Sequence, residues 1–131
     1  MREILFRGKQ IYNGDWVEGY YGVYFNGEKD VACICVSTYK TGAACYEVIP
    51  ETVGQYTGLT DKIGTKIFEG DILRFRTLDY RLEPAERKAN VLWMGYAWLL
   101  GNSQDGLYLF LDDIDINSMD VTVIGNIYES Q

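Results

Sequence analysis

The sequence predicts a mainly β chain that ends in a small barrel. Three observations predict it: an aromatic content of 15% dominated by 11 tyrosines, two Asn-Gly dipeptides between β-prone segments, and glycines that recur every few residues through the middle of the chain. Aromatic side chains suit half-buried pleated surfaces, and Asn-Gly is the strongest short-range signal for a hairpin. A chain of 131 residues can bury a real core without metals or disulfides.

The first part of the chain is predicted to form hairpins. Asn13-Gly14 and Asn26-Gly27 mark two type I′ turns, in which both residues take positive φ angles. Residues 15–25 alternate their larger side chains, and residues 31–39 form a β-branched run, so we expect a strand on each side of the second turn. A further strand is expected at 45–49. Residues 1–49 are therefore predicted as an N-terminal β-rich subdomain.

The second part, residues 50–131, is predicted to be the small barrel. Recurring glycines allow only short extended pieces joined by turns, as small barrels require: they are Gly54, Gly58, Gly64 and Gly70. One such piece is expected at 67–68 and the next strand at 72–75. The polar stretch 77–90 is predicted as an exposed connection with one helical turn at 85–88. Further strands are predicted by apolar runs at 91–100, 107–111 and 121–128.

Charge and hydropathy restrict the partners of the chain. The net charge of −7 and the isoelectric point of 4.5 produce a field that repels phosphate, which disfavours nucleic acid. The first residues, MREILFRGK, contain charges and no apolar signal segment, and no run of eighteen apolar residues follows. We expect a cytoplasmic protein that does not associate with membranes.

The residues that usually perform catalysis or bind metals are scarce. The chain has no histidine, which removes the commonest general base and the commonest metal ligand. Its three cysteines, Cys33, Cys35 and Cys45, are odd in number and lack the spacing of a four-ligand zinc site, so we expect reduced thiols. We predict no cofactor, no metal and no catalytic residue.

Two groups of carboxylates leave an enzymatic alternative open. A pair of acids in different environments can run hydrolysis or proton transfer, and the candidates are Glu47, Glu51, Glu69 and Asp71. The acidic turn from Asp112 to Asp115 copies the first ligand positions of a calcium loop. It has Ser118 and Ile124 where that loop requires glycine and glutamate, so a solvated turn is the simpler interpretation.

Two further groups of residues are candidates for contact with a partner. The aromatic side chains of Tyr56, Trp93, Tyr96 and Trp98 are of the kind that dominates interface energies, although each could equally belong to the core. A basic group lies near the tryptophans, as in proteins that bind single strands: Arg74, Arg76, Arg81, Arg87 and Lys88. Acidic residues among them reduce the net charge of that stretch.

Three stretches resemble the YopX family of phage and prophage proteins. They are FRGK (6–9) with NGDWVEG (13–19), VIPETVGQYTGLTDKIGTKIFEGDIL (48–73) and VIGNIYES (123–130). The resemblance implies an SH3-like small barrel preceded by a β-rich subdomain. The family has no established biochemical activity, so no catalytic residues carry over from it.

These observations together predict a non-enzymatic module that binds another protein or a second copy of itself. Nucleic-acid binding through the basic stretch from Arg74 to Lys88 is the first alternative. An enzyme that uses carboxylates or a metal is the second.

Overall fold

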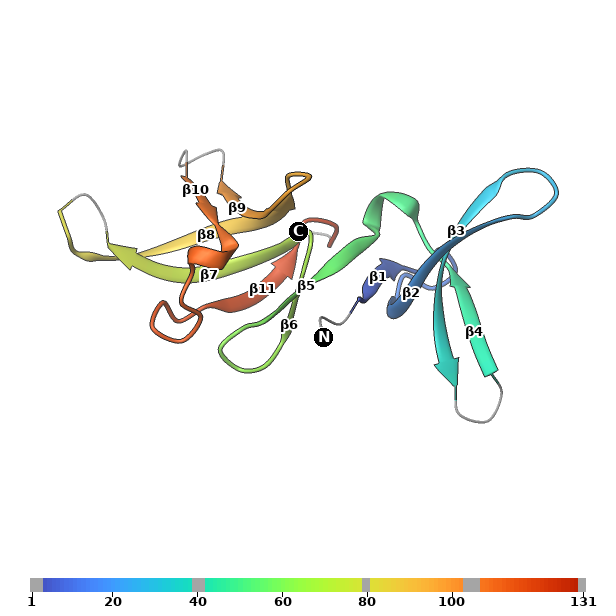
Figure 1. Cartoon of the computed structure of the whole chain (residues 1–131), viewed down its shortest axis with the longest axis horizontal. Coiled ribbons are helices and arrows are strands. Elements are labelled where there is room, and N and C mark those ends of the chain that lie inside the picture. The colour runs from blue at the N-terminus through green and yellow to red at the C-terminus, as the bar shows by residue number, and fades with distance from the viewer. Residues whose placement is uncertain (1–3, 39–41, 79–80, 103–106, 130–131) are drawn as a thin grey trace. The chain divides into compact units, whose positions relative to one another are not determined.

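The computed structural model describes residues 4–38, 42–78, 81–102 and 107–129 (Figure 1). They form antiparallel strands joined by turns and two three-residue 3-10 helices, so the predicted mainly β class is confirmed. The chain divides into two compact units, Met1–Tyr56 and Thr57–Gln131. The boundary predicted from the sequence lies after Ile49 instead. Within the described ranges no helix is long and apolar enough to cross a membrane.

The first unit is built on an antiparallel sheet with the strand order β4-β3-β2-β1-β5. Its elements are β1 (Phe6–Lys9), β2 (Trp16–Phe25), β3 (Asp30–Thr38), β4 (Gly42–Glu47), the 3-10 helix η1 (Pro50–Thr52) and β5 (Gly54–Thr60). The residues after η1 stay with this unit because Gly54 and Gln55 pair with β1. Beyond the unit boundary, β5 pairs with β6 (Lys66–Phe68).

The two Asn-Gly turns lie where the sequence predicts them, but their geometry differs from type I′. Only the glycines take positive φ angles, 75° at Gly14 and 101° at Gly27. The Asn13 Oδ1 atom accepts a hydrogen bond from the Asp15 amide, and the Asn26 Oδ1 atom accepts two from the amides that follow it. The asparagines therefore act through Asx turns, which satisfy backbone donors, and only the glycine of each turn takes a positive φ angle.

The core of the first unit lies under the middle of β3. Ala32, Ile34 and Val48 are buried together, with partly buried Phe6, Val17 and Val53 packed against them. Gly19 in β2 is required by this packing, because a Cβ atom there would lie 2.4 Å from the carbonyl oxygen of Cys35. The glycine thus allows β2 to approach the β3 backbone closely.

The second unit contains a five-stranded antiparallel sheet with the order β10-β9-β8-β7-β11. Its elements after β6 are β7 (Asp71–Leu78), β8 (Pro84–Trp93), β9 (Trp98–Asn102), β10 (Leu107–Phe110), the 3-10 helix η2 (Leu111–Asp113) and β11 (Thr122–Asn126). Alternate strand residues form most of the core, which is completed by residues between β10 and β11. It contains Ile67, Leu73, Phe75, Ala89, Val91, Leu100, Leu111, Ile114 and Val121. The SH3-like barrel stays a prediction with which this sheet is compatible.

Two predictions for the second unit are wrong. The stretch 77–90 is not an exposed connection with a helical turn, because β7 continues to Leu78 and β8 begins at Pro84, forming the long hairpin in Figure 1. Proline is tolerated at the first residue of a strand. From there Ala85, Arg87 and Ala89 lie on one face of β8, and Glu86 and Lys88 lie on the other. Residues 91–100 are two strands, since the chain turns back at Gly95, whose φ angle is 88°.

Buried carboxylates fix the turns of the second unit. Asp61, which is 4% exposed, accepts hydrogen bonds at Oδ1 from the amides of Ile63 (3.0 Å) and Thr65 (2.8 Å). Its Oδ2 atom accepts a third, from the Val123 amide at 3.0 Å. Asp71, also buried, accepts a hydrogen bond from the Phe68 amide at 2.7 Å. The first carboxylate therefore joins the β5–β6 turn to β11, and the second holds the β6–β7 turn.

Replacing Asp61 with asparagine should lower the free energy of unfolding by about 3 kcal/mol, because one backbone donor would then face a side-chain amide that cannot accept. Urea unfolding measures the change. Asp112→Asn is the matched control, since Asp112 is exposed and its substitution should stay within about 0.5 kcal/mol of the parent. Equal stability of the two variants would contradict the role of Asp61.

Candidate functional site

The hairpin of β8 and β9 carries three of the four predicted interface aromatics. Trp93 and Trp98 lie directly opposite each other, with ring centroids 4.8 Å apart. Tyr96, in the turn, is 76% exposed, and Met94 beside it is also exposed. Trp98 packs partly against the core of the second unit. The fourth residue, Tyr56, is buried and belongs to the first unit.

A second exposed apolar surface lies on the first unit, and the sequence analysis did not identify it. It consists of Tyr21, Val23 and Phe25 on β2 together with Tyr46 on β4, all at least 40% exposed; we call it the apolar face. The pairing register places Tyr21 and Tyr46 on the two sides of the fully buried Ile34, and residues that pair across a sheet share a face. The apolar face is therefore continuous with the core beneath it.

Strand β4 forms the edge of the sheet next to the apolar face. On the inner side, which faces β3, the Val48 amide donates a hydrogen bond to the Ala32 carbonyl. On the opposite, outer side, the Glu47 carbonyl accepts a hydrogen bond from the Ile11 amide. Because backbone groups alternate in direction along an antiparallel strand, the N–H and C=O groups of Ala43 and Cys45 point to the outer edge. These are the groups with which another extended segment would pair.

The predicted basic residues do not form one patch. Arg74, Arg76 and Lys88 share an exposed face of the β7–β8 hairpin, whereas Arg87 lies opposite the buried Phe75 and Arg81 lies in the turn. Carboxylates neutralise part of this charge. Arg74 Nε lies 3.6 Å from Glu86 Oε1, and Arg76 Nε lies 4.0 Å from Asp120 Oδ2.

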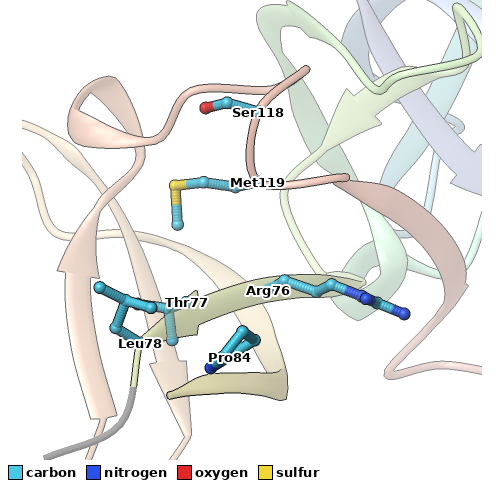
Figure 2. Close-up of a pocket in the computed structure, with 6 residues that line it drawn as sticks. All are labelled: Arg76, Thr77, Leu78, Pro84, Ser118 and Met119. Atoms are coloured by element: carbon cyan, nitrogen blue, oxygen red, sulfur yellow. The ribbon is translucent and has the colours of Figure 1, made fainter. Parts of the chain in front are cut away.

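A hollow of about 480 Å³ opens beside the ends of β7 and β8. It is lined by Arg76, Thr77, Leu78, Pro84, Ser118 and Met119. In Figure 2 the Met119 side chain points toward the end of β7, while the guanidinium of Arg76 is turned away from the other lining residues. The lining is mainly apolar, so this hollow offers packing surface rather than catalytic groups.

The cysteines differ from the expectation of three reduced thiols. Cys35 and Cys45 form a disulfide, and Cys33 is a buried free thiol. The reason is the strand register, which places Cys35 directly opposite Cys45 in the β3–β4 pair. The odd number of cysteines, from which reduced thiols were expected, gives no information about which cysteines the strand register brings together.

The carboxylates of the enzymatic alternative are distributed between the units. Glu47 and Glu51 lie in the first unit, and Glu69 and Asp71 lie in the second, where the Asp71 carboxylate holds a turn. In the acidic turn, hydrogen bonds from Ser118 and from the Asn117 amide hold the pKa of Asp115 below its usual value. Nowhere in the described part of the chain do three or more His, Cys, Asp or Glu residues lie close enough to hold a metal ion.

The comparisons with known proteins identify a family and a similar structure. The model of the YopX protein family matches residues 5–131. The crystal structure of protein EF1440 from Enterococcus faecalis aligns with a TM-score of 0.48 and 20% sequence identity, over 97% of this chain and 94% of that one. No curated protein has significant sequence similarity to the chain.

The ion pair between Lys62 and Asp120 generates a prediction for the titration of Asp120. The ammonium donates a hydrogen bond to Asp120 Oδ1 at 2.5 Å, and this bond, followed by charge attraction, holds the pKa of that carboxyl below its usual value. Lys62→Met should raise the pKa, which carboxyl-carbon NMR measures directly. An unchanged pKa would show that the ion pair does not persist in solution.

The same shift fixes the direction of an effect on stability. A carboxyl whose pKa is lowered by folding stabilises the native state above its unfolded pKa, and that contribution is lost as the pH falls through the folded value. Lys62→Met should therefore reduce the stability difference between neutral and acid pH.

Proposed function

The chain belongs to the YopX family, and from this premise we propose that it is a non-enzymatic protein-binding module whose partner is a second copy of itself. Edge strand β4, beside the apolar face, is the observation that carries the proposal. The family resemblance further leads us to propose that the protein is encoded by a phage or prophage and works in the bacterial cytoplasm.

The residues of β4 suit pairing between two copies. The strand reads GAACYE, and Glu47 at its end is the one charged residue, so β4 lacks the lysines and prolines that usually protect an exposed edge. If two β4 strands pair antiparallel about Ala44, Ala43 of each copy lies opposite Cys45 of the other. Their outward N–H and C=O groups can then bond reciprocally.

The same register is compatible with the side chains. Tyr46 of one copy would lie opposite Gly42 of the other, which leaves room for the ring. Ala44 would lie opposite its own copy, on the same side of the sheet as the apolar face. The pairing would thus place the two apolar faces next to each other on one side of a continuous sheet.

Net charge adds a feature that distinguishes this proposal from nucleic-acid binding. Each copy carries a net charge of −7, so two copies repel at long range and added salt should strengthen their association. Nucleic-acid binding remains the second candidate because Arg74, Arg76 and Lys88 share one exposed face. It predicts the opposite salt dependence, since binding to phosphates weakens steeply as salt is added.

Sedimentation velocity over a range of protein concentrations tests the proposal. The parent chain should show a monomer–dimer equilibrium that shifts toward the dimer with added salt. Ala43→Lys should weaken association at least about 10-fold, because the edge would acquire a lysine that must be desolvated on pairing. The variant should retain the circular dichroism of the parent.

Ile63→Lys is the matched control, since Ile63 is 75% exposed in the β5–β6 turn of the second unit, and this variant should associate like the parent. A parent chain that stays monomeric at every concentration would overturn the proposal, as would a dimer that Ala43→Lys leaves intact.

A further inference from the structure

The three cysteines gather on one side of the β3–β4 pair. Cys33 and Cys35 are two residues apart on β3 and share a face, and Cys45 lies directly across from Cys35. The Cys33 Sγ atom lies 3.8 Å from the Cys35 Sγ atom, which is bonded to Cys45. A free thiol therefore contacts one sulfur of a disulfide.

We propose that these cysteines form a thiol–disulfide exchange centre. The Cys33 thiol loses its proton to solvent, and the thiolate attacks Cys35 Sγ. The Cys33–Cys35 bond forms as the Cys35–Cys45 bond breaks, and the bonding electron pair leaves on Cys45 Sγ, which can take up a proton. No external oxidant or reductant is needed, because one disulfide and one thiol are present before and after the step.

The exchanged form places a disulfide between two neighbours on one face of β3. Residues two apart in a strand have Cα atoms about 6.6 Å apart, near the upper end of the separations that a disulfide spans, about 4.4–6.8 Å. A disulfide also requires Cβ atoms about 3.5–4.5 Å apart, closer than two parallel side chains on one face of an extended strand. The Cys33–Cys35 bond therefore requires a local distortion of β3, and we expect it to be the less populated of the two disulfides.

Exchange moves the free thiol from the interior to the surface. Cys33 is 5% exposed and donates a hydrogen bond to the Gly22 carbonyl, whereas Cys45 is exposed. Cys45 also lines a hollow of about 470 Å³ together with Ile11, Tyr12 and Tyr46. The buried thiol thus becomes an accessible thiolate beside apolar and aromatic groups, which can react with small disulfides or electrophiles.

The chemical class of reactant follows from this position. A small disulfide that enters the hollow would be attacked by the Cys45 thiolate, giving a mixed disulfide on Cys45 and releasing one small thiolate. The centre acts within a single chain, so it does not depend on the self-association proposed above.

The experiment is a short alkylation of the native, oxidised protein with iodoacetamide, followed by acid quenching and mass spectrometry of non-reduced peptides. The label should appear on Cys45, and the labelled molecules should contain a Cys33–Cys35 disulfide. Cys33→Ser should retain the Cys35–Cys45 disulfide and lose at least 90% of the Cys45 labelling, on the order of a 10-fold reduction. Cys33→Ala should behave in the same way, so the result does not depend on one variant folding.

Three outcomes would overturn the proposal. Label on Cys33 with the Cys35–Cys45 disulfide intact would show direct access to the buried thiol without exchange. Equal labelling of Cys45 in the parent and in Cys33→Ser would show that Cys33 takes no part. Label on all three cysteines would show that the oxidised protein holds no disulfide from which exchange could start.

Discussion

The buried carboxylate of Asp61 is the constraint on which the second unit depends. A carboxylate taken out of water costs several kcal/mol unless hydrogen bonds replace its hydration, and Asp61 recovers them from three backbone amides. One of those amides belongs to Val123, 62 residues further along the chain. The neighbouring Lys62 amide donates to the Val121 carbonyl, so this turn holds the chain at the start of β11 as well. Without these bonds, β11 would be held mainly by its pairing with β7.

The sequence predicts the strands well where local chemistry determines them. Asn-Gly dipeptides and β-branched runs locate β2 and β3, and the glycine-rich middle locates the short β6. The prediction fails from 77 to 90 because charged residues usually mark a loop. Here Glu86 and Lys88 lie on one face of a strand, and the other face carries Ala85, Ala89 and Val91 together with Arg87. A period of two among charged and small residues is only a weak signal for a strand. This segment is a strand because it pairs with the neighbouring strand β7.

The candidate surfaces were only partly predictable, for a related reason. Trp93 and Trp98 are recognisable as aromatic candidates, but their meeting on one hairpin depends on the turn at Gly95. The apolar face does have a signal in the sequence. From Tyr20 to Phe25 both alternating sets of residues are apolar, apart from glycine, and a strand in a sheet with one core can cover only one set. Such a strand must leave apolar side chains exposed or bury them against a partner.

In the first unit, the disulfide helps to hold the edge strand β4 in place. An edge strand has one neighbour, so it opens more easily than a central strand, and an opened strand cannot act as a template for pairing. The Cys35–Cys45 bond joins β4 to β3 at a position where the backbone groups of Cys45 point outward, so it adds to the hydrogen bonds of the pair without replacing them. It therefore keeps β4 extended while its outer backbone groups stay available. A cross-link at this position is compatible with the proposal that the β4 edge is used for recognition.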